Sequence, residues 1–304
     1  MDKLTAAAER VRSGVGEAVL LLGESGIGKS RLIHEWIARS THWTAAVAEC
    51  SQGTSNGPYD LLKKLVASAL DIELSRVETV DLSRNASLTT WSPTDRSALA
   101  SVLEGQVDPE WHTLTPAARG RAINNSCARL LRERSSVVPM AVLIEDLHWI
   151  DEASRSVIEA VLATLDTSRV LVIATARMGY ATEWLPATTI RLSALRHAEG
   201  LELISAMLRA DATPALKEQI FRHTGGVPLF IEEVCRDVGT RKVQNLGLQP
   251  EPTLQSTVSS LHGSTGWKGQ ASNFCRVPPP SVADAMPSCY IPFQHWILRV
   301  LPLR

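Results

Sequence analysis

The chain has 304 residues, of which 44% are hydrophobic and 21% charged, and its formal net charge is −1. This balance excludes a protein that binds nucleic acid or an anionic membrane surface through bulk charge. No apolar run approaches the roughly 18 residues that a membrane-crossing helix needs, and the first residues lack the pattern of a signal peptide. The five cysteines form no CxxC pair, which disfavours a disulfide framework or a zinc site and predicts a reducing cytoplasm.

Composition changes sharply near the end of the chain. Residues 1–245 carry 57 of the 63 charged residues, whereas residues 246–304 carry only six of them and eight of the sixteen prolines. We therefore expect a folded region up to residue 245, followed by a Pro-rich, low-charge tail that is disordered or out of frame.

Residues 1–195 alternate between strand and helix patterns. A helix is expected after the first strand, over 31–39, and another begins after Asp151, which can cap its first turn. Residues 60–135 are a mainly helical insertion. Such alternation predicts an α/β fold, with a parallel sheet between two helical layers. Short continuous apolar runs predict strands at 18–22, 140–144 and 170–175, a weaker run predicts one at 44–48, and residues 188–192 can add a fifth.

From residue 196 the pattern is helical only, which predicts a small lid subdomain over 196–245. Three helices are expected there, around 201–208, 216–223 and 229–238. The sequence Gly225-Gly226-Val227-Pro228 falls between the last two and fits the end of one helix and the start of the next. A second interpretation, nucleotide contact by Pro228, stays open.

Residues 23–30 fit the pattern G-x-x-x-x-G-K-[ST] of a phosphate-binding loop, between an apolar strand and an amphipathic helix. Its glycines allow the backbone N–H groups to converge on phosphate oxygens, and the helix adds its positive end. Lys29 can reach the β- and γ-phosphates, and the Ser30 hydroxyl is a ligand for Mg²⁺. The predicted nucleotide-binding residues are Gly23, Glu24, Ser25, Gly26, Ile27, Gly28, Lys29, Ser30 and Pro228.

Two further strand ends carry candidate catalytic residues. Glu145 and Asp146 end the third strand, where Glu145 can hold the water shell of Mg²⁺ and Asp146 can polarise the attacking water. Helix capping or an exposed acidic turn is the alternative. Arg177 leaves the fourth strand, where it can stabilise the γ-phosphate or form a surface ion pair. A packing or hydrogen-bonded role is predicted for His148 and Trp149.

The motifs GESGIGKSRL, VLIEDLHWIDEAS, LVIATAR and HTGGVPLFIEEV occur in an order that resembles the STAND class of signal-transduction ATPases. They are similar to Orc1-like AAA ATPase modules attached to bacterial adenylate or guanylate cyclases and to large LuxR-type regulators. The resemblance implies a P-loop NTPase core that binds ATP or ADP with Mg²⁺ and hydrolyses ATP slowly as a conformational switch. It also implies effector or sensor domains outside this chain, and it allows oligomerisation on ATP binding.

The chain departs from this resemblance in three places. Many relatives have Asp where this chain has Glu145. This difference affects the geometry of Mg²⁺ binding, so the resemblance supports ATP binding more strongly than ATP hydrolysis. A Gly-Arg element upstream of the phosphate loop is missing, and the helical arm expected after residue 258 is replaced by a segment without helical or strand periodicity. These last two departures predict a module that is cut at both ends.

A frameshift near Leu261 explains the tail. With permitted codons chosen for residues 263–282, a shifted frame reads LDWLEGPGKQLLQGAAAI, an amphipathic and family-like helix. The coding DNA decides between this hypothesis and a natural Pro-rich tail.

Taken together, the motifs predict ATP binding and Mg²⁺-dependent hydrolysis in a signalling or regulatory protein. A non-catalytic ATP-binding scaffold and a fragment of a transcriptional regulator are the alternatives. No direct contact with nucleic acid or membrane is predicted.

Overall fold

The computed structural model describes residues 1–40, 42–50, 59–73, 81–82, 85–208 and 212–244. The chain divides into two compact units between Ser193 and Ala194. The predicted tail over 246–304, with its frameshift hypothesis, lies outside the described residues. Among the residues described, no helix is both long enough and apolar enough to cross a membrane.

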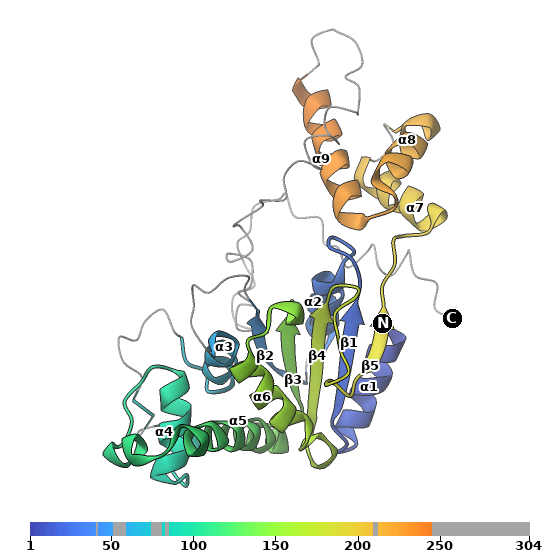
Figure 1. The fold of residues 1–304 in the computed structure, drawn as a ribbon. Helices are drawn as coiled ribbons and strands as arrows, with labels where there is room; N and C mark the ends of the chain where they lie inside the picture. Colours follow the sequence, from blue (N-terminus) through green and yellow to red (C-terminus); the bar gives the residue numbers. More distant parts are fainter. Residues whose placement is uncertain (41, 51–58, 74–80, 83–84, 209–211, 245–304) are drawn as a thin grey trace, which may run out of the picture. The chain divides into compact units, whose positions relative to one another are not determined.

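The first unit is built on a five-stranded parallel sheet with the order β2-β3-β4-β1-β5 (Figure 1). This confirms the predicted α/β fold, and each strand lies within two residues of its expected range. β3 and β4 are almost fully buried, as expected for strands covered on both faces. The strands are β1 (Glu17–Leu22), β2 (Thr44–Glu49), β3 (Met140–Glu145), β4 (Val170–Ala176) and β5 (Thr188–Arg191).

Helices cover both faces of the sheet, which gives the three-layer core that the sequence predicts. On one face, α1 (Asp2–Arg12) and α2 (Lys29–Arg39) bury Leu4 and Ile33 against Leu143 of the sheet. On the other face, two helices of the insertion and the helix between β3 and β4 pack against alternate residues of the same strands. They are α3 (Asp60–Ala69), α5 (Pro116–Val137) and α6 (Glu152–Leu162). Asp151 caps α6 as predicted, because its side chain accepts a hydrogen bond from the Ser154 N–H at 2.9 Å.

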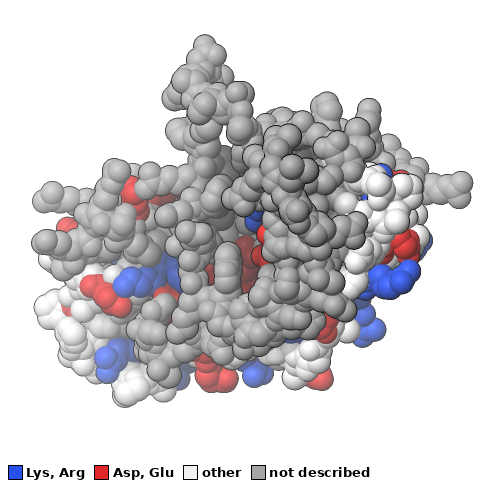
Figure 2. Space-filling view, turned by 90° about the horizontal axis from the view of Figure 1, so that it is seen from above, with Lys and Arg blue, Asp and Glu red and all other residues white. Residues whose placement is uncertain are grey.

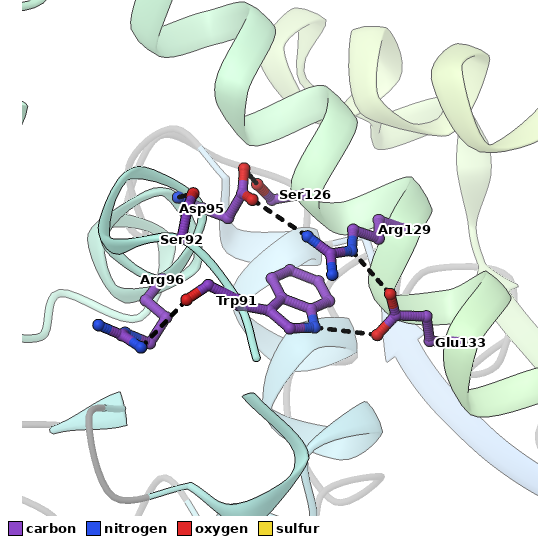
Figure 3. A network of polar contacts seen from close by, with 7 residues as sticks. All are labelled: Trp91, Ser92, Asp95, Arg96, Ser126, Arg129 and Glu133. Carbon is purple, nitrogen blue, oxygen red and sulfur yellow. Dashed lines mark hydrogen bonds and ion pairs between the residues drawn. The ribbon is translucent and has the colours of Figure 1, made fainter. Parts of the chain in front are cut away.

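A polar network ties α4 (Pro93–Val102) to α5 within the insertion (Figure 3). The Arg129 guanidinium lies 4.2 Å from the centre of the Trp91 ring and contacts Asp95 at 3.1 Å and Glu133 at 2.7 Å. The Trp91 indole N–H donates to the same Glu133 carboxylate at 2.9 Å. Arg129 is therefore held by acidic residues of both helices and by the Trp91 ring that precedes α4.

Short 3₁₀ turns complete the first unit. They lie in the insertion and in the connections that follow β3 and α6. Their bounds are Ala86–Leu88, Pro109–Thr113, Leu147–Trp149 and Leu165–Thr167.

The second unit is helical, with α7 (His197–Leu208), α8 (Pro214–Thr224) and α9 (Pro228–Gln244). Its own small core contains Ile204, Ile220 and Ile231, one from each helix. Gly225 adopts a left-handed conformation with φ 59° at the end of α8, and Pro228 is the first residue of α9. The predicted end and start of these helices are present, because glycine tolerates positive φ and proline suits a first helical turn.

Candidate nucleotide site

The predicted phosphate-binding loop connects β1 to α2 at the carboxyl edge of the sheet, where parallel α/β folds bind ligands. Gly26 and Gly28 have φ values of 76° and 96°, which a side chain would strain. A Cβ on Gly23 would lie 2.8 Å from Cγ2 of Ile27 and 3.1 Å from the Leu192 carbonyl oxygen. Glycine is therefore required at these positions for the loop to curl over the start of α2.

Lys29 is buried at the first residue of α2. Its Nζ donates hydrogen bonds to the carbonyl oxygens of Gly23 and Glu24, both at 2.9 Å, so the side chain folds back across the loop. Burial lowers the pKa of Lys29, and the nearby Arg177 lowers it further, while the charge of Asp146 opposes the shift. The loop thus holds a cation that an anionic ligand would stabilise.

Ser30 and Glu145, the two residues predicted to bind the metal, are brought together from α2 and β3. The Ser30 hydroxyl donates a hydrogen bond to the Glu145 carboxylate, whose other oxygen lies 3.5 Å from Nε2 of His34. Hydroxyl and carboxylate oxygens are the hard ligands that Mg²⁺ prefers. The donors present therefore fit this ion. No group of three His, Cys, Asp or Glu side chains in the described part of the chain could bind a metal by itself.

Asp146 follows β3 with a φ of 53°, an uncommon conformation for a residue other than glycine. Its backbone N–H donates to the Oγ1 of Thr175 at 2.9 Å. The buried end of β4 therefore holds the main chain at Asp146, from which the carboxylate extends. Arg177 comes two residues after Thr175 and is exposed. Its charge lowers the pKa of Lys29 and of His148, which places it in the same group of charges.

His148 differs from its expected hydrogen-bonded state. Only 10% of its side chain is exposed, yet neither ring nitrogen has a hydrogen-bond partner, and Nδ1 lies 3.9 Å from a carboxylate oxygen of Asp146. Burial lowers its pKa, so the ring is neutral near pH 7. Its predicted packing role is present in part, because the ring lies against Trp149 with 5.1 Å between the ring centres. The two ring nitrogens of His148 therefore lie without a hydrogen-bond partner beside Asp146.

Two polar residues at this edge were missed by the sequence motifs. Thr175 supplies the acceptor for Asp146, and its hydroxyl at the end of an otherwise apolar strand was the available signal. Glu49 ends β2 directly opposite Glu145 in the parallel register. It falls one residue beyond the strand expected at 44–48, and only the pairing of β2 with β3 places it here.

The predicted site residues of the first unit therefore gather at one edge of the sheet. Figure 2 looks down on the molecule from above, and acidic and basic atoms are visible near the centre of the view. Pro228 belongs to the second unit, at the start of α9. Three cysteines, Cys50, Cys127 and Cys235, are buried free thiols, and burial raises the pKa of each to about 12. They are therefore unreactive residues of the core.

Comparisons with known proteins identify a family that the chain matches. Residues 1–173 match the AAA ATPase domain family. An uncharacterized protein of Rhizobium meliloti (strain 1021) is 29% identical over 238 residues, which is 74% of this chain but 23% of that protein. The chain thus spans about a quarter of the length of this curated relative.

Solved structures with similarity to the chain include one from an archaeon and one from Drosophila. One is a signal transduction ATPase with numerous domains (STAND) with a tetratricopeptide repeat sensor from Pyrococcus horikoshii, at 13% identity and a TM-score of 0.44, covering 84% of this chain and 32% of that one. Another is Drosophila ORC bound to DNA, at 12% identity and a TM-score of 0.37, covering 80% and 52%. The family match spans more than half of the chain, including the phosphate loop and β3, and the chain belongs to the AAA ATPase domain family.

Proposed function

We propose that the chain binds ATP with Mg²⁺ at the edge formed by the ends of β1, β3 and β4, and that it hydrolyses the ATP slowly. The change between ATP- and ADP-bound forms would act as a switch in a larger signalling or regulatory protein. Membership of an ATPase family supports the nucleotide, and the short span relative to the curated relative supports a module that acts with other domains.

The observation that carries this proposal is the contact between Ser30 and Glu145. Those residues are separated by 115 positions, yet their oxygens meet beside the buried Lys29. A Mg²⁺-nucleotide requires a lysine, a hydroxyl and a carboxylate. Here the lysine and the hydroxyl come from the start of α2, and the carboxylate comes from the end of β3. Helix capping, the alternative for the acidic pair, does not account for this contact, because Glu145 contacts α2. Asp146 precedes the 3₁₀ turn Leu147–Trp149 but makes no capping hydrogen bond through its side chain.

Each residue of the site has a role that follows from its position. Lys29 neutralises charge on the β- and γ-phosphates, and the loop N–H groups bind the phosphate oxygens. Asp146 accepts the proton of the attacking water as its oxygen bonds to the γ-phosphorus and the bond to ADP breaks. Thr175 keeps Asp146 in place through the main-chain hydrogen bond, and Arg177 stabilises negative charge that develops on the γ-phosphate.

The residues that would hold Mg²⁺ are Ser30 and Glu145, both placed where their oxygens already meet. When bound, the ion would neutralise phosphate charge and reduce repulsion of the incoming water. The side chain of Asp146 is 44% exposed, compared with 18% for Glu145. This difference suits a division in which Glu145 binds the ion and Asp146 meets the water.

ATP affinity and phosphate release, measured on the purified chain with and without Mg²⁺, test the proposal. The Asp146→Asn variant should keep the affinity for ATP and lose turnover by about 10²–10⁴-fold, because the amide cannot accept the proton. Glu145→Gln should weaken the dependence of binding on Mg²⁺. Binding without any phosphate release by the wild type would favour the non-catalytic scaffold, and absence of binding would refute the site.

A further inference from the structure

Glu49 lies at the carboxyl edge of the sheet, where the candidate nucleotide site is. It belongs neither to the phosphate-loop motif nor to the acidic motif at the end of β3. In the parallel pairing of β2 with β3, Glu49 is the partner of Glu145. Alternate residues of a strand point to opposite faces, and Ala46 and Ala48 of β2 are buried with the insertion helices. Glu49 therefore points to the opposite face, which α1 and α2 cover.

Glu145 points to the same face. Ala141 and Leu143 precede it by four and two residues, and both are buried in the cluster that contains Ile33 of α2. Cross-strand partners on one face of a sheet are close neighbours, and like charges placed opposite each other destabilise the pair. The two glutamates thus form such a pair beside Ser30.

The charges around Glu49 are mostly negative. The carboxylates of Glu145 and Asp146 act on it, and the ammonium group of Lys64 opposes them. Lys64 also donates from Nζ to the main-chain oxygen of Glu49 at 3.0 Å, which attaches α3 to the end of β2. The end of the strand is therefore held in place with its carboxylate next to two others.

We infer that Glu49 is a positioning residue for the divalent cation, and that its carboxylate holds the water shell of an ion whose direct ligands are Ser30 and Glu145. This inference rests on the proposed function. Glu49 acts through water, because Ser30 and Glu145 already contact each other and β2 lies one strand further than β3 from the phosphate loop that follows β1. A bound cation would relieve the repulsion between the paired glutamates.

Independent evidence for an occupant at this edge comes from His148. Its side chain is nine-tenths buried beside Asp146, and both ring nitrogens lack a partner. Buried polar atoms in native proteins normally have a hydrogen-bond partner, so two ring nitrogens without one point to a bound water, ion or ligand. Glu49 and the His148 ring thus share Asp146 as a neighbour.

A structural role and a role toward the cation make opposite predictions for Glu49→Gln. If Glu49 only stabilised the fold, its loss would lower the melting temperature of the nucleotide-free chain. If it serves the cation, the variant removes a repulsion that Lys64 offsets only in part when the ion is absent. The melting temperature without ligand should then stay equal or rise, while the affinity for Mg²⁺ falls.

The experiment titrates Mg²⁺ into the full chain with a fluorescent ATP analogue and records the half-saturating Mg²⁺ concentration. For Glu49→Gln this concentration should rise about tenfold, as is typical when an outer-shell partner of a metal is lost. Affinity for the analogue without Mg²⁺ should be unchanged. Glu49→Asp keeps the charge and should restore most of the Mg²⁺ response.

Glu9→Gln is the matched control, because it removes a surface carboxylate of α1 that lies near Arg12. It should leave the Mg²⁺ titration unchanged. Equal Mg²⁺ requirements in Glu49→Gln and the wild type, or a lower melting temperature in the variant, would overturn the inference alone. A wild-type chain that does not bind the analogue at any Mg²⁺ concentration would overturn the proposed function as well.

Discussion

The hydroxyl of Ser30 on α2 donates a hydrogen bond to the carboxylate of Glu145 on β3, across 115 residues of sequence. The contact exists because β1 and β3 end at the same edge of one parallel sheet, with β4 between them. The helix that follows β1 then brings its first turn against the end of β3. This geometry places the predicted metal ligands, the buried lysine and the acidic pair within one small region, and the predictions below depend on it.

Lys29→Met should lower the affinity for ATP by about 2–5 kcal/mol, more than about 30-fold, because phosphate charge would lose its buried partner. Isothermal titration calorimetry measures the change. The rise in melting temperature that ATP induces in the wild type should be absent from the variant. Lys63→Met, which removes a half-buried cation that pairs with Glu104 at 3.0 Å, is the control. Equal ATP affinity in Lys29→Met and the wild type would contradict the site.

Affinity for ATP should fall as the pH rises toward the lowered pKa of Lys29. Below that pKa the ammonium is charged and binds phosphate, and above it the attraction is lost. The window begins below the ordinary lysine value of 10.5, because burial lowers the pKa. ATP affinity measured between neutral and alkaline pH tests this, with Lys29→Arg as the comparison, because arginine keeps its charge over this range.

Stability without nucleotide should change in the opposite direction over the same window. The pKa of Lys29 is lower in the folded chain than in the unfolded chain, so the unfolded chain binds more protons there. The Lys29 contribution to the free energy of unfolding therefore increases with pH until the ordinary value is reached. Urea unfolding of the wild type and Lys29→Arg at several pH values isolates this contribution. A contribution that decreased with pH would contradict the assigned direction.

Thr175→Val should reduce ATP turnover by about tenfold, because the Asp146 N–H loses its acceptor and the carboxylate loses its fixed direction. The buried N–H left without a partner should also cost about 1–3 kcal/mol of stability. Phosphate release and urea unfolding measure the two effects. Ser135→Ala removes another buried hydroxyl, one that donates to the Arg132 carbonyl within α5, and it should leave turnover unchanged. Wild-type turnover in Thr175→Val would show that Asp146 does not depend on this hydrogen bond.

Arg129→Met should destabilise the first unit by about 1–2 kcal/mol, because the cation–π contact with Trp91 and the ion pairs with Asp95 and Glu133 are lost together. Affinity for ATP should not change. Urea unfolding followed by tryptophan fluorescence measures the loss. Arg132→Met, three residues further along α5 and exposed, should have little effect. Equal losses in the two variants would show that the network in Figure 3 contributes no specific stability.

Local patterns in the sequence were enough to predict most of the fold. Apolar runs of the right length identified all five strands of the sheet, and Asp151 and Pro228 marked helix starts that the structure contains. These features depend on neighbours along the chain, so they can be read without knowing the tertiary structure. Nothing local predicted the role of Arg129, because its partner Trp91 lies just before α4, far from α5 in the sequence.

The candidate site divides in the same way. By itself the sequence determined the phosphate loop, because its glycines, lysine and serine are consecutive, and it identified the acidic pair and Arg177 as residues at strand ends. Only the tertiary structure decided that Ser30 meets Glu145, that Thr175 holds Asp146 and that Glu49 stands opposite Glu145. The physical reason is that strand order and register fix which strand ends are neighbours, and both arise from packing between residues distant in the sequence.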